Sequence, residues 1–284
     1  MQHLTGFASL AARYDGFILD LWGVIHDGVT PYPGAIDCLR HLRAMGKPTI
    51  LLSNAPRRAH VAQAGMRGMG IPDDLYTGIL TSGEATHMML RDRTDPFFVA
   101  LGARVYHLGP ERDRNVIEGL DLQRVETPEA ADFVLNTGPD DLGSATDAVE
   151  WDDVLHACHR AGLPMVCANP DLEVIRGGNR LICAGALTER YEAMGGLARW
   201  VGKPDPGVYA PVLAMLGLDR ARVLAVGDAL RTDIAGAASV GIASCWVLGG
   251  IHGEELGADR DRIDAAAADA GLAPVACLPA FVWG

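Results

Sequence analysis

Residues 17–24 read Phe-Ile-Leu-Asp-Leu-Trp-Gly-Val, a short apolar run that ends in a carboxylate. Four further runs of β-branched and apolar residues have the same character, at 48–53, 78–81, 222–228 and 243–249. Helix-like stretches separate such runs, the first at 35–45, which follows a Pro-Gly pair and ends at Gly46. This alternation is typical of βαβ units. It predicts an α/β fold in which the five runs form one parallel sheet.

A second set of strand-like runs interrupts the first set, at 104–109, 132–138 and 164–169. It predicts an α/β cap domain inserted into a core domain. We place the cap at residues 85–197 and the core at residues 1–84 and 198–284. The hinges are expected near 81–88 and 195–201, where small residues and glycines cluster.

The charge of the chain excludes two classes of partner. Its 284 residues carry a formal net charge of −12 at pH 7. General affinity for nucleic acid or for an anionic membrane requires concentrated Lys and Arg, so neither partner is expected. An anionic small molecule would need a local positive group, such as a metal ion, a lysine or a helix N-terminus.

The cysteines and the N-terminus indicate a cytoplasmic protein. The six cysteines show no C-x-x-C spacing, which argues against a zinc site or a compact disulfide framework and favours free thiols. The first residues lack a basic stretch followed by a long apolar run, and no segment has the apolar length of a membrane span. We therefore expect a cytoplasmic location.

Four short segments place chemically capable side chains at the ends of predicted strands or at helix starts. They are Asp20, Ser53-Asn54, Val201-Gly-Lys-Pro204 and Val226-Gly-Asp-Ala-Leu-Arg-Thr-Asp233. In an open parallel sheet, ligands bind beyond the carboxyl ends of the strands. Each segment alone is more often a turn, a loop or a helix cap. Their joint occurrence in this order favours a catalytic site.

This set of residues has the chemistry of phosphoryl transfer. The carboxylate of Asp20 can attack phosphorus in line and form an aspartyl-phosphate that water later cleaves. Because one anion then attacks another, positive charge is needed. Magnesium held by Asp20, a backbone carbonyl and Asp228 would supply it, together with Lys203. Asp233 is suited to orienting metal-bound water.

Hydrogen-bond donors for the phosphate are expected after the second strand. The hydroxyl of Ser53 can donate to a phosphoryl oxygen. The backbone N–H groups that follow Asp20 and Ser53 add further donors, the second being that of Asn54.

The four segments resemble the four sequence motifs of the haloacid dehalogenase (HAD) superfamily, and the resemblance covers nearly the whole chain. The insertion lies between the second and third motifs and carries Asn169-Pro-Asp171, followed by Gly185-Ala-Leu187. This arrangement is similar to the NagD-like, class IIA branch, which includes phosphatases for nucleotides, phosphoglycolate and pyridoxal phosphate. The resemblance implies a Rossmann-like parallel-sheet core with an inserted α/β cap. It also implies a magnesium-dependent hydrolase of small phosphorylated metabolites.

The resemblance assigns a role to each matching residue. Asp20 is the nucleophile, and Lys203 holds and neutralises phosphate with Ser53 and Asn54. Magnesium would be held by Asp20, the Trp22 carbonyl and Asp228, with support from Asp233. By family analogy we expect a homodimer formed through the cap.

The sequence departs from the family pattern at Trp22, where family phosphatases carry a second aspartate that protonates the leaving group. An indole cannot do this, which favours acyl and aryl phosphates, whose leaving groups need no proton. Two residues of a predicted flap, His26 and Asp27, are alternative acids, but His26-Asp27-Gly28 is also a strong turn signal. Trp22 itself is either an apolar floor for an aromatic substrate or core packing.

The cap is expected to select the substrate. Asn169 and Asp171 lie on a loop after a predicted cap strand, with Asp140 and Arg176 as further candidates. The alternative is turn chemistry, because Asn-Pro and Gly-Pro-Asp-Asp are also ordinary loop signals.

Two other functions compete with a phosphatase. One is a non-catalytic homologue that binds a phosphorylated ligand as a sensor and has lost turnover with the acid. The other is a dehalogenase-like enzyme, which needs no leaving-group proton. It is disfavoured because that chemistry has no use for the magnesium site that Asp228 and Asp233 suggest.

Overall fold

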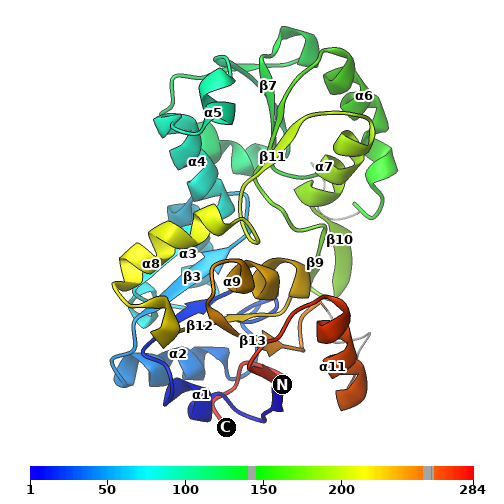
Figure 1. Cartoon of the computed structure of the whole chain (residues 1–284). Coiled ribbons are helices and arrows are strands. Elements are labelled where there is room, and N and C mark those ends of the chain that lie inside the picture. Colours follow the sequence, from blue (N-terminus) through cyan, green and yellow to red (C-terminus); the bar gives the residue numbers. More distant parts are fainter. Residues whose placement is uncertain (140–144, 252–256, 258) are drawn as a thin grey trace.

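Two parallel sheets form the framework of the molecule. The computed structural model describes residues 1–139, 145–251, 257 and 259–284. In Figure 1 the larger sheet lies in the lower half and the smaller sheet, built from residues in the middle of the sequence, in the upper half. The α/β fold predicted from the sequence, with a second α/β unit inserted in the first, is confirmed.

The larger sheet has seven strands in the order β1-β14-β13-β12-β2-β3-β4, all parallel. The five predicted runs are the five neighbouring strands at one side of it: β2 (Gly16–Leu19), β3 (Thr49–Ser53), β4 (Gly78–Thr81), β12 (Val223–Gly227) and β13 (Ala243–Val247). The sequence interpretation missed two short strands, β1 (Gln2–His3) and β14 (Ala276–Leu278). Strands of two and three residues are too short for a periodicity to be visible.

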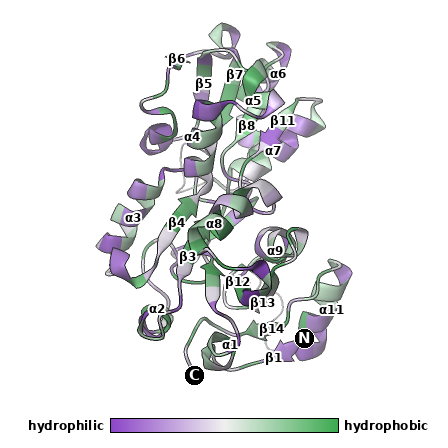
Figure 2. Cartoon of the chain, turned by 60° about the vertical axis from the view of Figure 1, so that its left-hand side comes forward, coloured by the Kyte–Doolittle hydropathy of each residue, from purple (hydrophilic) through white to green (hydrophobic). Residues whose placement is uncertain are grey.

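Helices cover both faces of this sheet, and its central strands β2, β3 and β12 are buried along their whole length. Strand β2 shows how one strand serves both faces: Phe17 and Leu19 belong to one hydrophobic cluster, and Ile18 belongs to another. This division follows from the alternation of side chains along a strand. Figure 2 shows the green, hydrophobic strands enclosed by helices with purple, hydrophilic segments. These helices are α1 (Ala8–Ala11), α2 (Ala35–Ala44), α3 (Ala59–Gly68), α8 (Tyr209–Leu216), α9 (Ala235–Ser239) and α11 (Arg260–Asp269).

The smaller sheet has five parallel strands in the order β11-β8-β7-β5-β6. Its strands are β5 (Arg104–Leu108), β6 (Gln123–Val125), β7 (Phe133–Asn136), β8 (Met165–Cys167) and β11 (Ala198–Trp200). Its helices are α4 (Ser82–Asp92), α5 (Pro96–Ala100), α6 (Asp152–Arg160) and α7 (Ala184–Ala193). Short 3-10 or π turns complete the chain at η1 (Asp73–Leu75), η2 (Glu111–Ile117), η3 (Pro128–Ala130), η4 (Ala148–Trp151), η5 (Pro206–Val208), η6 (Arg220–Arg222) and η7 (Leu230–Ile234).

The smaller sheet extends three residues past the predicted end of the insertion. The prediction ended the insertion at residue 197, but β11 pairs with β8, so the smaller sheet continues to Trp200. At the other junction, helix α4 begins directly after β4, with Thr81 as its N-cap. Both predicted hinges therefore contain regular structure, because the glycines that suggested loops lie at the ends of these elements.

An antiparallel hairpin, β9 (Glu173–Arg176) and β10 (Asn179–Ile182), extends from the smaller sheet toward the larger one (Figure 1). Gly177 and Gly178 form its turn with positive φ angles of 53° and 81°, as a type I′ turn requires. On the core side, Arg180 of the hairpin donates to the carbonyl of Ile251 at 3.5 Å. The hairpin therefore joins the two halves at the carboxyl edge of the larger sheet.

Among the described helices, none combines the length and the hydrophobicity that a membrane span requires.

The two ends of the described chain are joined inside the core. The N–H of Phe7 donates to Val282 at 2.8 Å, and the ring of Phe7 meets Phe281 edge-on with centroids 4.9 Å apart. Phe7 also contacts Phe17 of β2, at a centroid distance of 5.3 Å. Phe7 thus links the C-terminal segment to the strand that leads to Asp20.

We predict that Phe281→Ala lowers the free energy of unfolding by about 3–5 kcal/mol, because it opens a cavity where a fully buried ring was packed. Urea unfolding followed by circular dichroism would measure this change. The control is Val149→Ala, at a position 51% exposed, which should change stability by less than about 0.5 kcal/mol. Equal stability of the two variants would show that the C-terminal segment is not part of the core.

Candidate active site

The larger sheet brings its strand-end residues to one place. Strands β12, β2 and β3 are neighbours, with Leu19 in register with both Val226 and Leu51. Chain order reverses on the two sides of β2, and such a switch point opens a crevice at the carboxyl edge. Asp20, Ser53 and Asp228 stand there because each lies at or just after the end of its strand.

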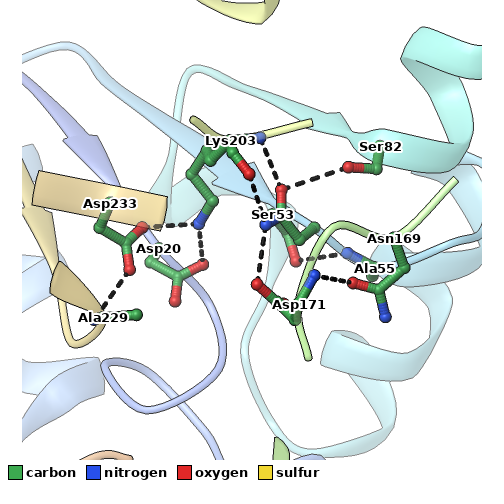
Figure 3. A network of polar contacts seen from close by, with 10 residues as sticks. Asp20, Ser53, Ala55, Ser82, Asn169, Asp171, Lys203, Ala229 and Asp233 are labelled. Atoms are coloured by element: carbon green, nitrogen blue, oxygen red, sulfur yellow. Dashed lines mark hydrogen bonds and ion pairs between the residues drawn. The ribbon is translucent and has the colours of Figure 1, made fainter. Parts of the chain in front are cut away.

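Lys203 lies at the centre of the site, as Figure 3 shows. Its ammonium nitrogen is 2.6 Å from Asp20 Oδ1 and 2.7 Å from Asp233 Oδ1, and the residue is only 3% exposed. Burial alone would lower the pKa of Lys203, but the charges of Asp20 and Asp233 outweigh burial and raise it. The side chain is therefore a fixed positive charge in the crevice.

Three buried carboxylates surround this ammonium. One oxygen each of Asp20, Asp228 and Asp233 lies within 4.8 Å of the others. Burial raises the pKa of Asp20, and burial together with the charge of Asp233 raises the pKa of Asp228 to about 7. Among the described residues, Lys203 is the cation that contacts these carboxylates, and its one positive charge does not balance three negative ones. A divalent cation with oxygen ligands fits this deficit, so the three aspartates could hold one.

Asp228 and Asp233 are oriented by backbone N–H groups. Asp228 Oδ2 accepts from Ile251 at 2.8 Å, and Asp233 Oδ2 accepts from Ala229 at 3.1 Å. A Cβ atom at Gly250 would lie 1.9 Å from Asp228 Oδ2, so only glycine lets the loop after β13 approach the carboxylate. The sequence interpretation missed this loop. The Gly-Gly pair that follows a strand was the available signal.

Ser53 and Asn54 follow β3 and have different environments. Ser53 is 1% exposed, and its hydroxyl accepts from the N–H of Ala55 at 3.2 Å, which leaves its own hydrogen able to donate. Asn54 Oδ1 accepts from the N–H of Lys203 at 2.8 Å and from Ser82 at 3.3 Å. Its Nδ2 donates to Lys203 O at 3.1 Å and to Asp171 at 2.8 Å.

The four contacts of Asn54 use the full hydrogen-bonding capacity of a side-chain amide. Its side chain therefore holds the backbone of Lys203 in place, and only its backbone N–H is left for phosphate. The sequence interpretation missed Ser82, the N-terminal residue of α4, which completes this arrangement.

The cap loop 169–171 reaches the core, as the sequence predicted it could. Asp171 accepts from Asn54, and the carbonyl of Pro170 accepts from Arg231. Burial raises the pKa of Asp171. Asn169 accepts from the N–H of Asp171 at 3.0 Å, which is turn chemistry. A turn therefore shapes this loop, and Asp171 faces the crevice, while the role of the loop in substrate selection stays a prediction.

The remaining cap candidates lie apart from the aspartates. Arg176, on β9, is exposed and lines a second, smaller cavity. Asp140 lies outside the described residues.

The flap after β2 is a turn. His26 is 4% exposed, its Nδ1 accepts from the N–H of Gly28 at 3.0 Å, and burial lowers its pKa to about 4. Asp27 Oδ1 accepts from the N–H groups of Val29 and Thr30 at 2.9 and 2.7 Å. Burial alone would raise the pKa of Asp27, but the hydrogen bonds from Thr30 and Val29 together outweigh burial and lower it. His26 is therefore neutral and Asp27 ionised near pH 7, and neither is suited to donate a proton.

Trp22 lies between two cavities. The larger cavity, of about 520 Å³, contains the aspartates and Lys203 and is bordered by Tyr32, Val174 and other apolar residues. The smaller cavity, of about 160 Å³, lies on the cap side. The indole lines both cavities, meets His26 edge-on at 5.4 Å and lies where a Cβ atom of Gly28 would clash at 2.0 Å. Trp22 packs against the core and also lines the crevice, so the interpretation as core packing is confirmed and the floor for an aromatic substrate stays a prediction.

Comparison with known proteins agrees with this geometry. Family models described as haloacid dehalogenase-like hydrolase and HAD-hydrolase-like match residues 17–123 and 200–273. A solved haloacid dehalogenase-like hydrolase from Brucella suis 1330 is 32% identical, with a TM-score of 0.84, and the match covers 98% of this chain and 100% of that chain.

Two relatives carry activities in their names. A D-glycerol 3-phosphate phosphatase of Mycobacterium tuberculosis is 32% identical over 86% of this chain, which spans 65% of that protein's length. A p-nitrophenyl phosphatase from Archaeoglobus fulgidus is 25% identical, with a TM-score of 0.71, over 94% of this chain and 96% of that chain.

A NagD structure also matches, with 26% identity and a TM-score of 0.66 over 84% of this chain and 90% of that chain. The Brucella relative matches along the full length of the chain, and the four motif segments meet around Lys203. This chain therefore belongs to the haloacid dehalogenase superfamily, in its NagD-like class IIA branch.

Proposed function

We propose that this protein is a magnesium-dependent phosphatase of small phosphorylated metabolites, with Asp20 as its nucleophile. The observation that carries the proposal is the Lys203 ammonium held between Asp20 and Asp233 beside Asp228. The names of two relatives, a glycerol 3-phosphate phosphatase and a p-nitrophenyl phosphatase, support the reaction class.

In the proposed reaction, a carboxylate oxygen of Asp20 attacks phosphorus and forms a P–O bond. The bond between phosphorus and the leaving oxygen breaks, and its electron pair departs with that oxygen. Water then hydrolyses the aspartyl-phosphate, which releases phosphate and restores Asp20. Lys203 orients the carboxylate before attack and stabilises the added charge on the phosphoryl oxygens. Ser53 and the backbone N–H groups of Leu21 and Asn54 complete the set of donors.

Asp20, Asp228 and the backbone carbonyl of Trp22 would hold magnesium, with support from Asp233. When bound, the ion neutralises charge on the phosphoryl group. Asp233 already contacts Lys203 and Ala229 through its two oxygens, so we assign it a supporting role, with Asp20 and Asp228 as the direct carboxylate ligands.

The leaving group receives no proton from the residue at position 22, because an indole is not an acid at any accessible pH. His26 and Asp27 do not replace that acid, since one is neutral and the other ionised in a turn. We therefore infer that the favoured substrates have leaving groups that are stable as anions, namely aryl or acyl phosphates. Trp22, Tyr32 and Val174 give such a leaving group an apolar surface.

A second candidate function is a phosphate-binding homologue without turnover. Trp22 favours this candidate, because loss of the general acid can abolish turnover while phosphate binding is kept. Turnover of p-nitrophenyl phosphate separates the two candidates, because its phenolate leaves without protonation. The homodimer through the cap stays a prediction.

Replacing the nucleophile tests the covalent mechanism. We expect Asp20→Asn to lower kcat for p-nitrophenyl phosphate by on the order of 10³-fold or more, because an amide is nearly isosteric but does not attack phosphorus. Asp27→Asn is the matched control, since an asparagine can still accept the two turn hydrogen bonds, and its kcat should stay within about twofold of the parent. Full activity of Asp20→Asn would rule out the mechanism.

A series of leaving groups tests the role of Trp22. The rate should fall steeply as the leaving group becomes more basic, so that aryl phosphates outpace alkyl phosphates. Trp22→Asp should raise kcat/KM for alkyl relative to aryl phosphates by about 10²-fold or more, within the range of a general acid. A thermal melt of the variant controls for the cavity left by the indole. A parent rate that is insensitive to leaving-group pKa, with no relative gain in a folded Trp22→Asp, would contradict the proposal.

Magnesium should stabilise the protein more at high pH than at low pH. The folded-state pKa of Asp228, about 7, lies above its ordinary value of 3.8. The native state therefore binds more protons than the unfolded chain between about pH 4 and pH 7. Without metal, the free energy of unfolding then falls as pH rises through this window.

We expect saturating magnesium to raise Tm by roughly 5 °C or more at pH 8 and by much less at pH 5, where the ion must displace protons. Differential scanning calorimetry measures both shifts, with sodium chloride at equal ionic strength as control. Asp228→Ala should lose the shift. Equal magnesium shifts at the two pH values would refute the assignment.

A further inference from the structure

The smaller cavity beside Trp22 contains a group of arginines that the reaction described above does not use. Its lining includes Arg57, Arg112 and Arg176 together with Asp113. Trp22, Asp171 and Val174 line this cavity and also the larger one that holds the aspartates and Lys203. The two cavities therefore meet at these shared residues. A molecule bound at Lys203 can extend across the indole toward the arginines.

The arginines come from three separate parts of the chain. Arg57 follows β3 in the core, Arg112 is in η2 of the cap, and Arg176 is in the β9 strand of the hairpin. The backbone of Arg57 is fixed, because its carbonyl accepts from Thr81 Oγ1 at 2.5 Å. The site is thus assembled only when the cap lies against the core.

The charges in this cavity are poorly matched. Asp113 Oδ1 lies 3.6 Å from Arg57 Nε and 4.0 Å from Arg112 Nε, both too long for hydrogen bonds. Arg57 Nε and Asp113 Oδ1 are buried and have no hydrogen-bond partner among the described residues. Burial lowers the pKa of Arg112. The negative charge of Asp113 opposes this effect, and the positive charges of Arg57 and Arg176 add to it. Buried donors without acceptors cost free energy, which an anion would recover.

We propose that this cavity is a subsite for a second oxyanion, a carboxylate or phosphate carried by the leaving group of the substrate. Guanidinium groups match such anions with paired N–H donors. A volume of about 160 Å³ suits one end of a ligand rather than a whole substrate, and Trp22 lies between this end and the scissile phosphate. The inference rests on the proposed function. It narrows the substrate class to phosphomonoesters with a second anionic group.

Binding to the Asp20→Asn variant tests the subsite without turnover. In the presence of magnesium, calorimetry would compare 4-carboxyphenyl phosphate with its neutral methyl ester, a matched pair of similar size. A third ligand, 1,4-phenylene bisphosphate, shows whether the subsite prefers a phosphate or a carboxylate at the far end of the ligand. We expect at least one of the two anionic ligands to bind about 10-fold more tightly than the ester.

Arginine variants in the same background locate the effect. Arg57→Gln and Arg176→Gln should each reduce the preference for the anionic ligand to within about threefold, with the affinity for phenyl phosphate unchanged. Arg176 is exposed, so Arg176→Gln is not expected to disturb folding. Arg57→Gln, by contrast, removes one of the positive charges beside the buried Asp113. Arg124→Gln, on exposed β6 of the same cap, is the matched control and should keep the full preference.

Two outcomes would overturn the subsite: equal binding of the ester and both anionic ligands, or a preference that survives in both arginine variants. Either result leaves the phosphatase proposal intact if the parent protein hydrolyses p-nitrophenyl phosphate. Failure of the phosphatase proposal has a different signature, namely no turnover of any ligand by the parent. A protein that binds none of these phosphates would overturn both proposals.

Discussion

The structure of the site depends on one buried ammonium among three buried carboxylates. Lys203 compensates only part of the negative charge of Asp20, Asp228 and Asp233, so the fold holds these groups together against their repulsion. The carboxylates are held in place by strand ends and backbone N–H groups, and the backbone of Lys203 is held by Asn54. The remaining charge deficit makes the crevice suited to a metal ion and a phosphate group.

The same constraint connects the cap to the core. Lys203 follows β11, a strand of the smaller sheet, yet its side chain completes the crevice of the larger sheet. Asn54 bonds both to the backbone of Lys203 and to Asp171 of the cap loop, and Arg231 of the core donates to Pro170 in that loop. A movement of the cap would therefore alter hydrogen bonds one residue away from the reacting groups.

The flap after β2 shows how burial decides between two interpretations of one sequence. His26 and Asp27 have the side chains of acids and bases, and their spacing from Asp20 placed both near the reacting groups. In the folded protein each accepts backbone hydrogen bonds that close a turn over Trp22. The indole then lies in the crevice with no acid beside it in the flap.

The apolar runs were sufficient to predict two sheets and the meeting of Asp20, Ser53, Lys203 and Asp228, because they mark parallel strands and such strands end at one edge. They did not determine β1, β6, β11, β14 or the β9–β10 hairpin, since most of these strands are too short to show a period. The role of the Asn54 side chain and the grouping of Arg57, Arg112 and Arg176 become visible only in the folded chain. Both depend on contacts between segments far apart in the chain, and single-sequence patterns carry no information about such distances.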